Sequence, residues 1–424
     1  MPPFTFAFLV AVAVTLAIRL WLARRQIAHV AAHRGEVPSE FAHRIELPAH
    51  QKAADYTQTR TRLAMIEAVF DTAVLLVLTL GGGIAALVRL TGDLNVGKLW
   101  QDLALIVMLV IVTGVASLPF GLWQTFVIEA RFGFNRTRFK LWLTDLVKGV
   151  LIGAALGLPL AAVALMLMRE AGSFWWLWAW AVWIAFQALM LALYPAVIAP
   201  LFNTFSPLPA GAARERIEGL LARCGFAGRG LYVMDGSKRS SHGNAFFTGF
   251  GRAKRIVFFD TLLERLAPEE VEAVLAHELG HFHLKHVGKR MVWTALGGLA
   301  FLALLAWLMT APWFFEGVGV PPALDRPGVA LVLFAMVLPA FTFLLAPIAA
   351  LYSRKHEFEA DAFAVAHASG SALVHALVKL YQDNASTLTP DPLHSTFYDS
   401  HPPAAIRIAR LQAVIEAHPA PALR

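Results

Sequence analysis

Two histidines four residues apart, with a glutamate between them, are the residues of this chain best suited to catalysis. They lie in the run His277-Glu278-Leu279-Gly280-His281. Residues i and i+4 project from one helical face, so both imidazoles could bind one zinc ion. Glu278 lies beside them and could take a proton from water held by that zinc. The run predicts a zinc hydrolase; the alternative is a surface helix with solvated His and Glu. Because Cys224 is the single cysteine, zinc would be held by histidine and carboxylate.

A third ligand is expected far downstream, in the polar stretch 353–361. Catalytic zinc takes three protein ligands and leaves one position open. Glu357 and Asp361 are i and i+4 and share a helical face, whereas Glu359 lies about 200° round the helix from Glu357. We therefore predict Glu357 as the ligand, with Glu359 as the alternative. Asp361 would accept a hydrogen bond from a ligating histidine and fix its tautomer, or it would pair with Arg354 or another cation.

The elements that must position these residues are largely apolar. The chain has 424 residues, of which 58% are hydrophobic and 15% charged, against roughly 25% charged in soluble domains. Each of seven blocks has about 20 residues or more, enough to cross a hydrocarbon core of ~30 Å. We expect the first to be a retained anchor, because no clear cleavage site follows it. The blocks are approximately Phe4–Ala23, Met65–Val88, Leu103–Phe126, Val147–Met168, Phe174–Ile198, Met291–Thr310 and Val329–Tyr352.

Connections rich and poor in Lys and Arg alternate along the chain. The short third connection carries Arg131, Arg136, Arg138 and Lys140, whereas the fourth has only Arg169. Basic connections stay on the cytoplasmic side. We therefore predict an integral, multi-pass membrane protein with its N-terminus outside and its catalytic domain in the cytoplasm. The net charge is +7, and the basic residues cluster beside the apolar blocks, which argues against nucleic-acid binding.

The two large polar parts are predicted to form one catalytic domain. Within them, short strands are expected at Gly230–Met234, Asn244–Phe250 and Arg255–Asp260. Helices are expected at Arg214–Cys224 and from Pro268 into the histidine run, since Pro suits the first turn. The expected organisation is a five-helix membrane region (1–198), the first catalytic part (199–290), transmembrane helices 6 and 7 (291–352) and the second catalytic part (353–424).

Several further motifs give the chain a family resemblance that covers nearly its whole length. It resembles the zinc-dependent type 1 CAAX prenyl endopeptidases, which are integral membrane metalloproteases. The resemblance implies seven transmembrane helices around a chamber, capped by an α+β zinc metalloprotease domain with a short sheet. It also implies removal of the C-terminal tripeptide of prenylated proteins. The motifs that carry it are 129–136, 198–203, 235–244, 277–281, 353–361, and 400–403 with Arg407.

The resemblance also implies roles for particular residues. One Zn²⁺ per chain would be held by His277, His281 and Glu357, with Glu278 as general base. Asn244 and Ala245 would bind the substrate at a strand edge, where peptides pair by strand addition. His401 and Arg407 would stabilise the developing oxyanion. From the residues alone, His401 is a loop histidine before two prolines.

Substrate and source are less constrained by the sequence. An Ala- and Arg-rich composition suggests a bacterial inner-membrane protein. Because most bacteria do not prenylate proteins, the alternative activity is quality control of damaged membrane proteins without a prenyl requirement. Two further alternatives are a non-catalytic zinc scaffold, against which Glu278 argues, and a transporter using the membrane carboxylates Glu67, Asp71 and Asp145.

Overall fold

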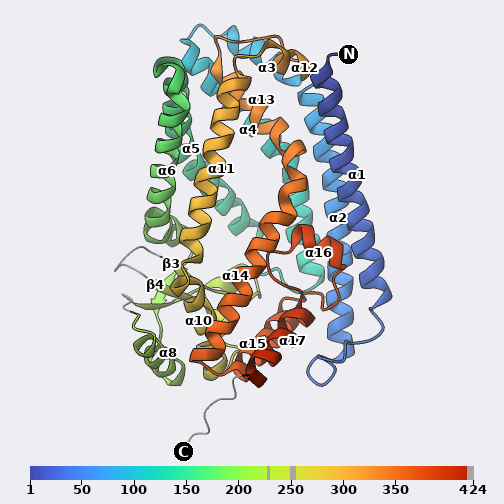
Figure 1. The fold of residues 1–424 in the computed structure, drawn as a ribbon, viewed down its shortest axis with the longest axis vertical. Coiled ribbons are helices and arrows are strands. Elements are labelled where there is room, and N and C mark those ends of the chain that lie inside the picture. Colours follow the sequence, from blue (N-terminus) through green and yellow to red (C-terminus); the bar gives the residue numbers. More distant parts are fainter. Residues whose placement is uncertain (227–229, 249–254, 418–424) are drawn as a thin grey trace, which may run out of the picture.

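The structure, a computed structural model, describes residues 1–226, 230–248 and 255–417. Long helices run along the molecule and end in a smaller part that combines helices with a sheet, at the bottom of Figure 1. Within these described residues, six helical segments are long and apolar enough to cross a membrane, and a bent pair raises the number to as many as seven. The prediction of a mostly α-helical membrane protein capped by a small sheet domain is confirmed.

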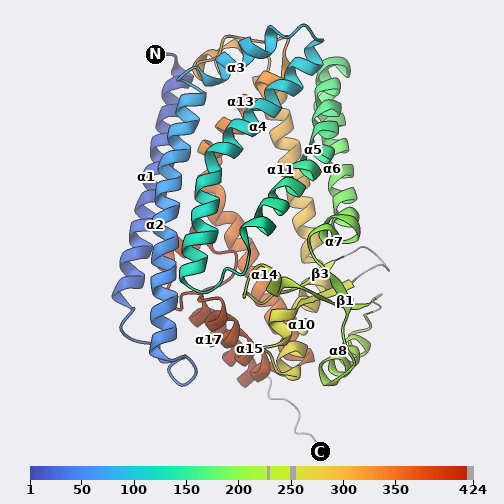
Figure 2. The ribbon, with the colours of Figure 1, turned by 180° about the vertical axis from the view of Figure 1, so that it is seen from behind.

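The spans correspond to the seven apolar blocks. In Figure 2, α1 and α2 lie along one side of the molecule and α5 and α6 along the other, with α4 running obliquely between them. The spans comprise α1 (Pro3–Ala32); α2 (Leu47–Leu78) with α3 (Gly83–Gly92); α4 (Lys98–Trp123) with the π-helix η1 (Gln124–Glu129); α5 (Phe139–Glu170); η2 (Gly172–Phe174), α6 (Trp175–Leu193), η3 (Tyr194–Ile198) and α7 (Ala199–Phe202); α11 (His286–Leu308); and α13 (Pro327–Thr342), η6 (Phe343–Leu345) and α14 (Ala346–His367).

The second apolar block is broken rather than continuous. Its two helices, α2 and α3, are bent by 48° at the intervening residues. Gly82 adopts φ +83°, a conformation that favours glycine. A Cβ at Gly81 would lie 2.6 Å from the carbonyl oxygen of Val77. The run of glycines 81–83 therefore permits a turn that apolar block length alone does not reveal.

The sheet has four strands in the order β1-β2-β4-β3. The β2–β4 pair is parallel and the two outer pairs are antiparallel, with Ala245 opposite Phe258. Among the described residues β3 is an edge strand, and positions 249 and 250 of its predicted extent lie outside them. The strands are β1 (Phe205–Pro207), β2 (Leu231–Met234), β3 (Ala245–Thr248) and β4 (Arg255–Phe259).

One hydrophobic core joins the sheet to helices from both polar parts of the chain. Phe258 of β4, Ile217 of α8, Leu373 of α15 and Ile408 of α17 are all fully or almost fully buried in it. The central helix, α10, contributes nearly all of its apolar residues. The remaining helices are α8 (Ala212–Arg223), η4 (Gly236–Lys238), α9 (Asp260–Leu263), α10 (Pro268–His283), α12 (Pro312–Gly317), α15 (Gly370–Asp383), α16 (Pro392–Tyr398) and α17 (Ala404–Ala417).

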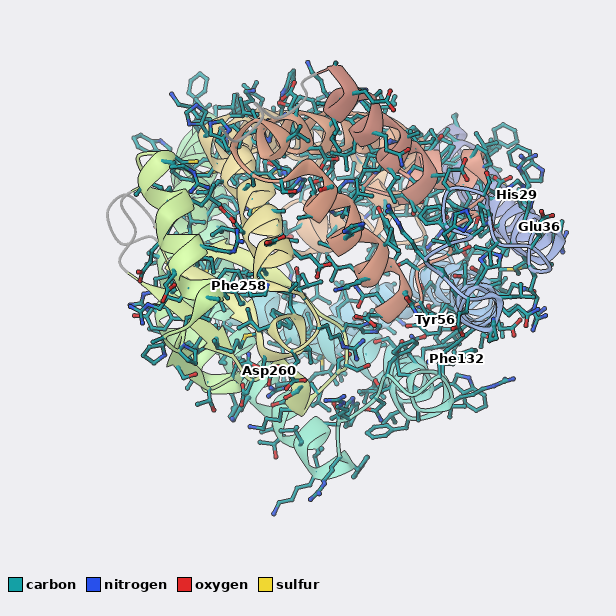
Figure 3. All side chains as sticks on the ribbon, turned by 90° about the horizontal axis from the view of Figure 1, so that it is seen from below. His29, Glu36, Tyr56, Phe132, Phe258 and Asp260 are labelled. Atoms are coloured by element: carbon teal, nitrogen blue, oxygen red, sulfur yellow. The ribbon has the colours of Figure 1, made fainter. Side chains whose placement is uncertain are left out.

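A smaller cluster connects the membrane helices to this core. Tyr56 of α2 packs edge-on against Phe132, with ring centroids 5.1 Å apart. Its hydroxyl donates to Glu129 at the end of η1, at 2.6 Å. Seen from below in Figure 3, Tyr56 and Phe132 lie on the side away from Phe258. The sheet-containing end is thus fixed to the membrane helices by packing as well as by chain connections.

Candidate metal centre

The helix that carries the histidine run is well specified by its sequence. Pro268 occupies its first turn, where no N–H partner is needed, and Glu269 and Glu270 place acidic charge at the positive end of the dipole. The Glu270 carboxylate accepts a hydrogen bond from the N–H of Ala267 at 2.7 Å. Residues 271–277 and 279–280 are buried. The helix therefore enters the core and projects His277 and His281 from one face.

The structure brings the two histidines together with Glu357 of α14. The Nε2 atoms of His277 and His281 are 3.1 Å apart. The Glu357 carboxylate oxygens lie 3.5 Å from Nε2 of His277 and 3.2 Å from Nε2 of His281. One ligand atom from each residue falls within 4.8 Å of the others. Three side chains separated by up to 80 residues therefore point at one place.

Close contact between α10 and α14 makes this convergence possible. Gly280 has no side chain where the helices meet. A Cβ there would lie 3.0 Å from Cα of Ala360 and 3.0 Å from Cβ of Phe363, closer than ordinary van der Waals contact. Ala360 is itself small and fully buried. The two small residues set the distance between the helix with the histidines and the helix with Glu357.

The chemistry of these donors fits a divalent cation. Two imidazole nitrogens and a carboxylate form a common ligand set for catalytic zinc. Oε2 of Glu357 is buried and has no hydrogen-bond partner among the described residues. A buried carboxylate oxygen without a donor carries a substantial desolvation cost. A metal ion bound by the three residues would remove that cost.

The other ring nitrogen of His277 is held by a buried ion pair. Its Nδ1 lies 2.8 Å from Oδ1 of Asp361, and Asp361 accepts two hydrogen bonds from Arg407 at 2.7 and 2.8 Å. Burial lowers the pKa of His277, but the nearby carboxylates of Asp361 and Glu357 outweigh this and raise it to about 9. The carboxylates that favour that proton would also favour a metal cation in its place. The cation beside Asp361 is thus Arg407, whereas Arg354 donates to the backbone oxygen of Ser395.

His281 has a different partner, which the sequence did not predict. Its Nδ1 lies 3.0 Å from Nδ1 of His286, the first residue of α11. Nε2 of His286 lies 2.9 Å from Oε2 of Glu359, and the ring stacks on His356 at 4.0 Å. Glu359, the alternative third ligand, therefore contacts His286 and not the His277–His281 pair. The available signal was the i, i+3 spacing of His356 and Glu359, which places both on one helical face.

Glu278 lines a cavity of about 110 Å³ together with His277 and Glu357. Asn244, Ala245, His401 and Arg407 line the same cavity. Burial raises the pKa of Glu278, which favours a group that must accept and return a proton near neutral pH. A bound dication would lower the pKa of Glu278. Seven of the predicted site residues thus surround one small space, while His281 and Asp361 contact it only through His277 and Glu357.

The substrate-binding candidates lie at the edge of the sheet. Asn244 is exposed and its side-chain oxygen accepts from the N–H of Ala245 at 2.8 Å, which leaves its amide hydrogens free to face outwards. His401 is exposed, and its Nε2 lies 3.5 Å from Oε1 of Glu357. His401 also lines a second cavity of about 550 Å³ between α1, α2 and the segment 381–404. The small cavity at Glu278 therefore adjoins a larger one at His401.

Of the membrane carboxylates considered for transport, Asp145 has a defined partner. It accepts two hydrogen bonds from Arg239 at 2.8 and 3.1 Å. Arg239 also donates to Asn203 and to the backbone oxygen of Phe202. This arrangement ties α5 to the sheet-containing part and gives Asp145 a structural explanation.

Comparison with known proteins accounts for both regions of the chain. Residues 26–204 match the family model described as CAAX prenyl protease N-terminal, five membrane helices, and residues 207–415 match Peptidase family M48. The chain is 38% identical over 319 residues to a CAAX prenyl protease 1 homolog of Oryza sativa subsp. japonica, covering 74% of each. It is 29% identical over 446 aligned positions to the homolog of Homo sapiens, covering 94% of this chain and 93% of that one. The crystal structure of S. mikatae Ste24p superposes with a TM-score of 0.90 at 28% identity, covering 97% of this chain and 99% of that one.

Proposed function

Because the chain belongs to peptidase family M48, as an integral membrane metalloprotease resembling CAAX prenyl protease, we propose that it is a zinc endopeptidase of the gluzincin type. His277, His281 and Glu357 hold one Zn²⁺, and Glu278 is the general base. The observation that carries this proposal is the convergence beside Glu278 of two imidazoles and a buried Glu357 oxygen that accepts no hydrogen bond among the described residues.

The chain's own residues then have distinct tasks. When bound, zinc polarises the scissile carbonyl and acidifies a coordinated water. Glu278 accepts a proton from the attacking water and delivers it to the leaving amine. His401 is accessible and stabilises the oxyanion. Arg407 donates two hydrogen bonds to Asp361, and its Nη2 and Nη1 also lie 3.2 Å from Nδ1 of His277 and 3.4 Å from Oε2 of Glu357. Arg407 lines the same cavity and stabilises the oxyanion together with His401.

The substrate is a peptide that pairs with the edge strand β3. Strand addition there would place the peptide backbone along Ala245, with Asn244 free to bind it through its side-chain amide. The relatives carry the name CAAX prenyl protease, which supports a prenylated C-terminal tail losing its last three residues. The alternative substrate is a damaged membrane protein, with no prenyl requirement.

The topology follows from the basic connections. Arg131, Arg136, Arg138 and Lys140 lie at the sheet-containing end, between η1 and α5. By the positive-inside rule this end faces the cytoplasm of a bacterial inner membrane. Digestion of a C-terminal tag in inverted vesicles, but not in right-side-out ones, checks this orientation.

Glu278→Gln tests the proposed mechanism. The variant should retain about one zinc per chain and lose turnover by roughly 10²- to 10⁴-fold, the contribution of a general acid–base group. Glu269→Gln is the matched control, because this glutamate lies on the same helix, is exposed and pairs with Arg216. Cleavage by Glu278→Gln at the rate of the unmodified protein would contradict the assignment.

Paired peptides test the substrate class. The purified protein with zinc is given the same C-terminal peptide with and without a prenyl group, and the products are identified by mass. Selective loss of three residues from the prenylated peptide is the expected result. Equal cleavage of both removes the lipid requirement, and cleavage of neither favours the quality-control alternative.

A further inference from the structure

Each of the two histidines uses Nε2 to face the other and Glu357, and each has a partner at Nδ1. For His277 that partner is the carboxylate of Asp361 at 2.8 Å. For His281 it is another imidazole, His286, at 3.0 Å. His286 is 1% exposed, so no solvent competes for this contact.

The proton positions in this second arrangement follow from the chemistry of imidazole. A neutral ring that offers Nε2 to a metal carries its proton on Nδ1. The Nδ1 of His281 is then the donor, so Nδ1 of His286 must be the acceptor. A neutral His286 that accepts at Nδ1 carries its own proton on Nε2, where the Glu359 carboxylate lies 2.9 Å away. In this series of hydrogen bonds, from His281 through His286 to Glu359, every donor then has one acceptor.

We infer that His286 is a positioning residue that accepts the Nδ1 proton of His281 and thereby fixes the ring that binds the metal. The inference rests on the proposed metal site. Glu359 holds the tautomer of His286, and His356 holds the plane of its ring by stacking at 4.0 Å with 8° between the planes. Such partners of metal-binding histidines orient the ring and raise its basicity.

A second metal ion in the same cluster is the competing explanation. His286, His356 and Glu359 also offer ligand atoms within 4.8 Å of one another. A ligand nitrogen, however, directs its lone pair within the ring plane. Because the two rings are stacked almost parallel, one ion cannot lie in both planes. The observed ring orientation therefore suits the positioning role and not a shared ion.

The turn between α10 and α11 brings His286 back towards His281. Lys285 adopts φ +56°, in the left-handed region, directly before α11 begins. On a continuous helix, residues five apart do not share a face. The left-handed residue breaks that geometry and lets the first residue of a membrane span reach the end of the preceding helix.

The test measures metal affinity, independently of catalysis. Purified His286→Ala competes for zinc with a chelator of known affinity, and its Co²⁺ form is examined by visible absorption. Loss of such a partner weakens metal affinity by about 10- to 100-fold, and the Co²⁺ spectrum should change. His286→Asn, which keeps an acceptor near the Nδ1 position, should recover most of the affinity.

His283→Ala is the matched control, since His283 lies on the same turn of chain but contacts Phe363. Thermal unfolding of the metal-free forms shows whether the variants remain folded. Unchanged zinc affinity in His286→Ala would overturn the inference. The inference would also be overturned if the unmodified protein bound two ions per chain and His286→Ala lost one of them while binding the other with unchanged affinity. His277→Ala separates the two proposals: if it loses zinc while His286→Ala does not, only the inference fails; if it keeps zinc, the proposed ligand set fails.

Discussion

Gly280→Ala should loosen the metal site without changing any residue that touches the metal. The added Cβ would lie 3.0 Å from Cα of Ala360 and from Cβ of Phe363. Ordinary contact begins at 3.4 Å, so α14 must move away by a few tenths of an ångström. Ala360 belongs to the helix turn that follows Glu357, so Glu357 must move with it. A displacement of about 1 Å in a catalytic site can cost ~10²-fold, and a displacement of a few tenths of an ångström costs proportionately less.

The expected effect is on the order of tenfold in zinc affinity and in kcat/KM. The free energy of unfolding should fall by about 2 kcal/mol or less. Overpacking costs roughly 1–3 kcal/mol, but replacing Gly by Ala within a helix returns about 1 kcal/mol. The variant should therefore remain folded while it binds zinc more weakly, which distinguishes a positional effect from unfolding.

Zinc competition against a chelator, peptide cleavage and thermal unfolding in detergent together test this expectation. Gly288→Ala is the matched control, because nothing lies within 4 Å of the position that its Cβ would take. If Gly280→Ala bound zinc and cleaved peptide as well as Gly288→Ala, close contact between α10 and α14 would not set the ligand geometry. Equal loss in both variants would also refute it.

Three further outcomes follow from the same structure. Asp361→Asn should weaken zinc binding by about 10- to 100-fold, measured by chelator competition, because it removes the carboxylate shared by His277 and Arg407. Asp102→Ala should destabilise the detergent-solubilised protein by roughly 3–5 kcal/mol, since it leaves Arg169 and Arg326 without their buried acceptor. Thermal unfolding checks this. Removal of zinc by a chelator should abolish cleavage and lower thermal stability, by about 2.7 kcal/mol relative to zinc at 100 times its Kd; re-addition should restore both.

Much of the architecture was predictable because it depends on local properties of the chain. Apolar length fixes which segments can span a membrane. Six of the seven predicted blocks correspond to single helical spans, and the second is divided between α2 and α3. The interruptions were not predictable in the same way. The bend between α2 and α3 depends on glycine conformation at Gly82, and an apolar count treats glycine as one more neutral residue.

For the sheet too, part of the structure was predictable from the sequence and part was not. Strands β2, β3 and β4 lie where β-branched and aromatic residues cluster, since composition records which segments suit a pleated surface. The short strand β1, Phe205–Pro207, has no β-branched residue and was not predicted. The order of the strands does not follow from composition. The parallel pairing of β2 with β4, and the place of β3 at the edge, come from how the chain crosses over the core. That placement matters because only an edge strand can accept a peptide by strand addition.

Within the site, helical periodicity succeeded where the relevant residues share one helix and failed where the chain turns. The i, i+4 spacing predicted that Glu357 and Asp361 share a face, and the structure places both against His277. The same periodicity places His286 off the face of His281, because the two residues are five positions apart. Lys285 in the left-handed region makes that rule inapplicable. No sequence periodicity records a single backbone conformation of this kind.

These contacts link the metal centre directly to the membrane-spanning helices. Glu357 lies on α14, which continues from the last span, and His286 is the first residue of the sixth. The ligand geometry consequently depends on how two spans are placed relative to α10. A soluble metalloprotease can fix its ligands within one globular core. Here the packing of the membrane-spanning helices is part of what positions the proposed ligands.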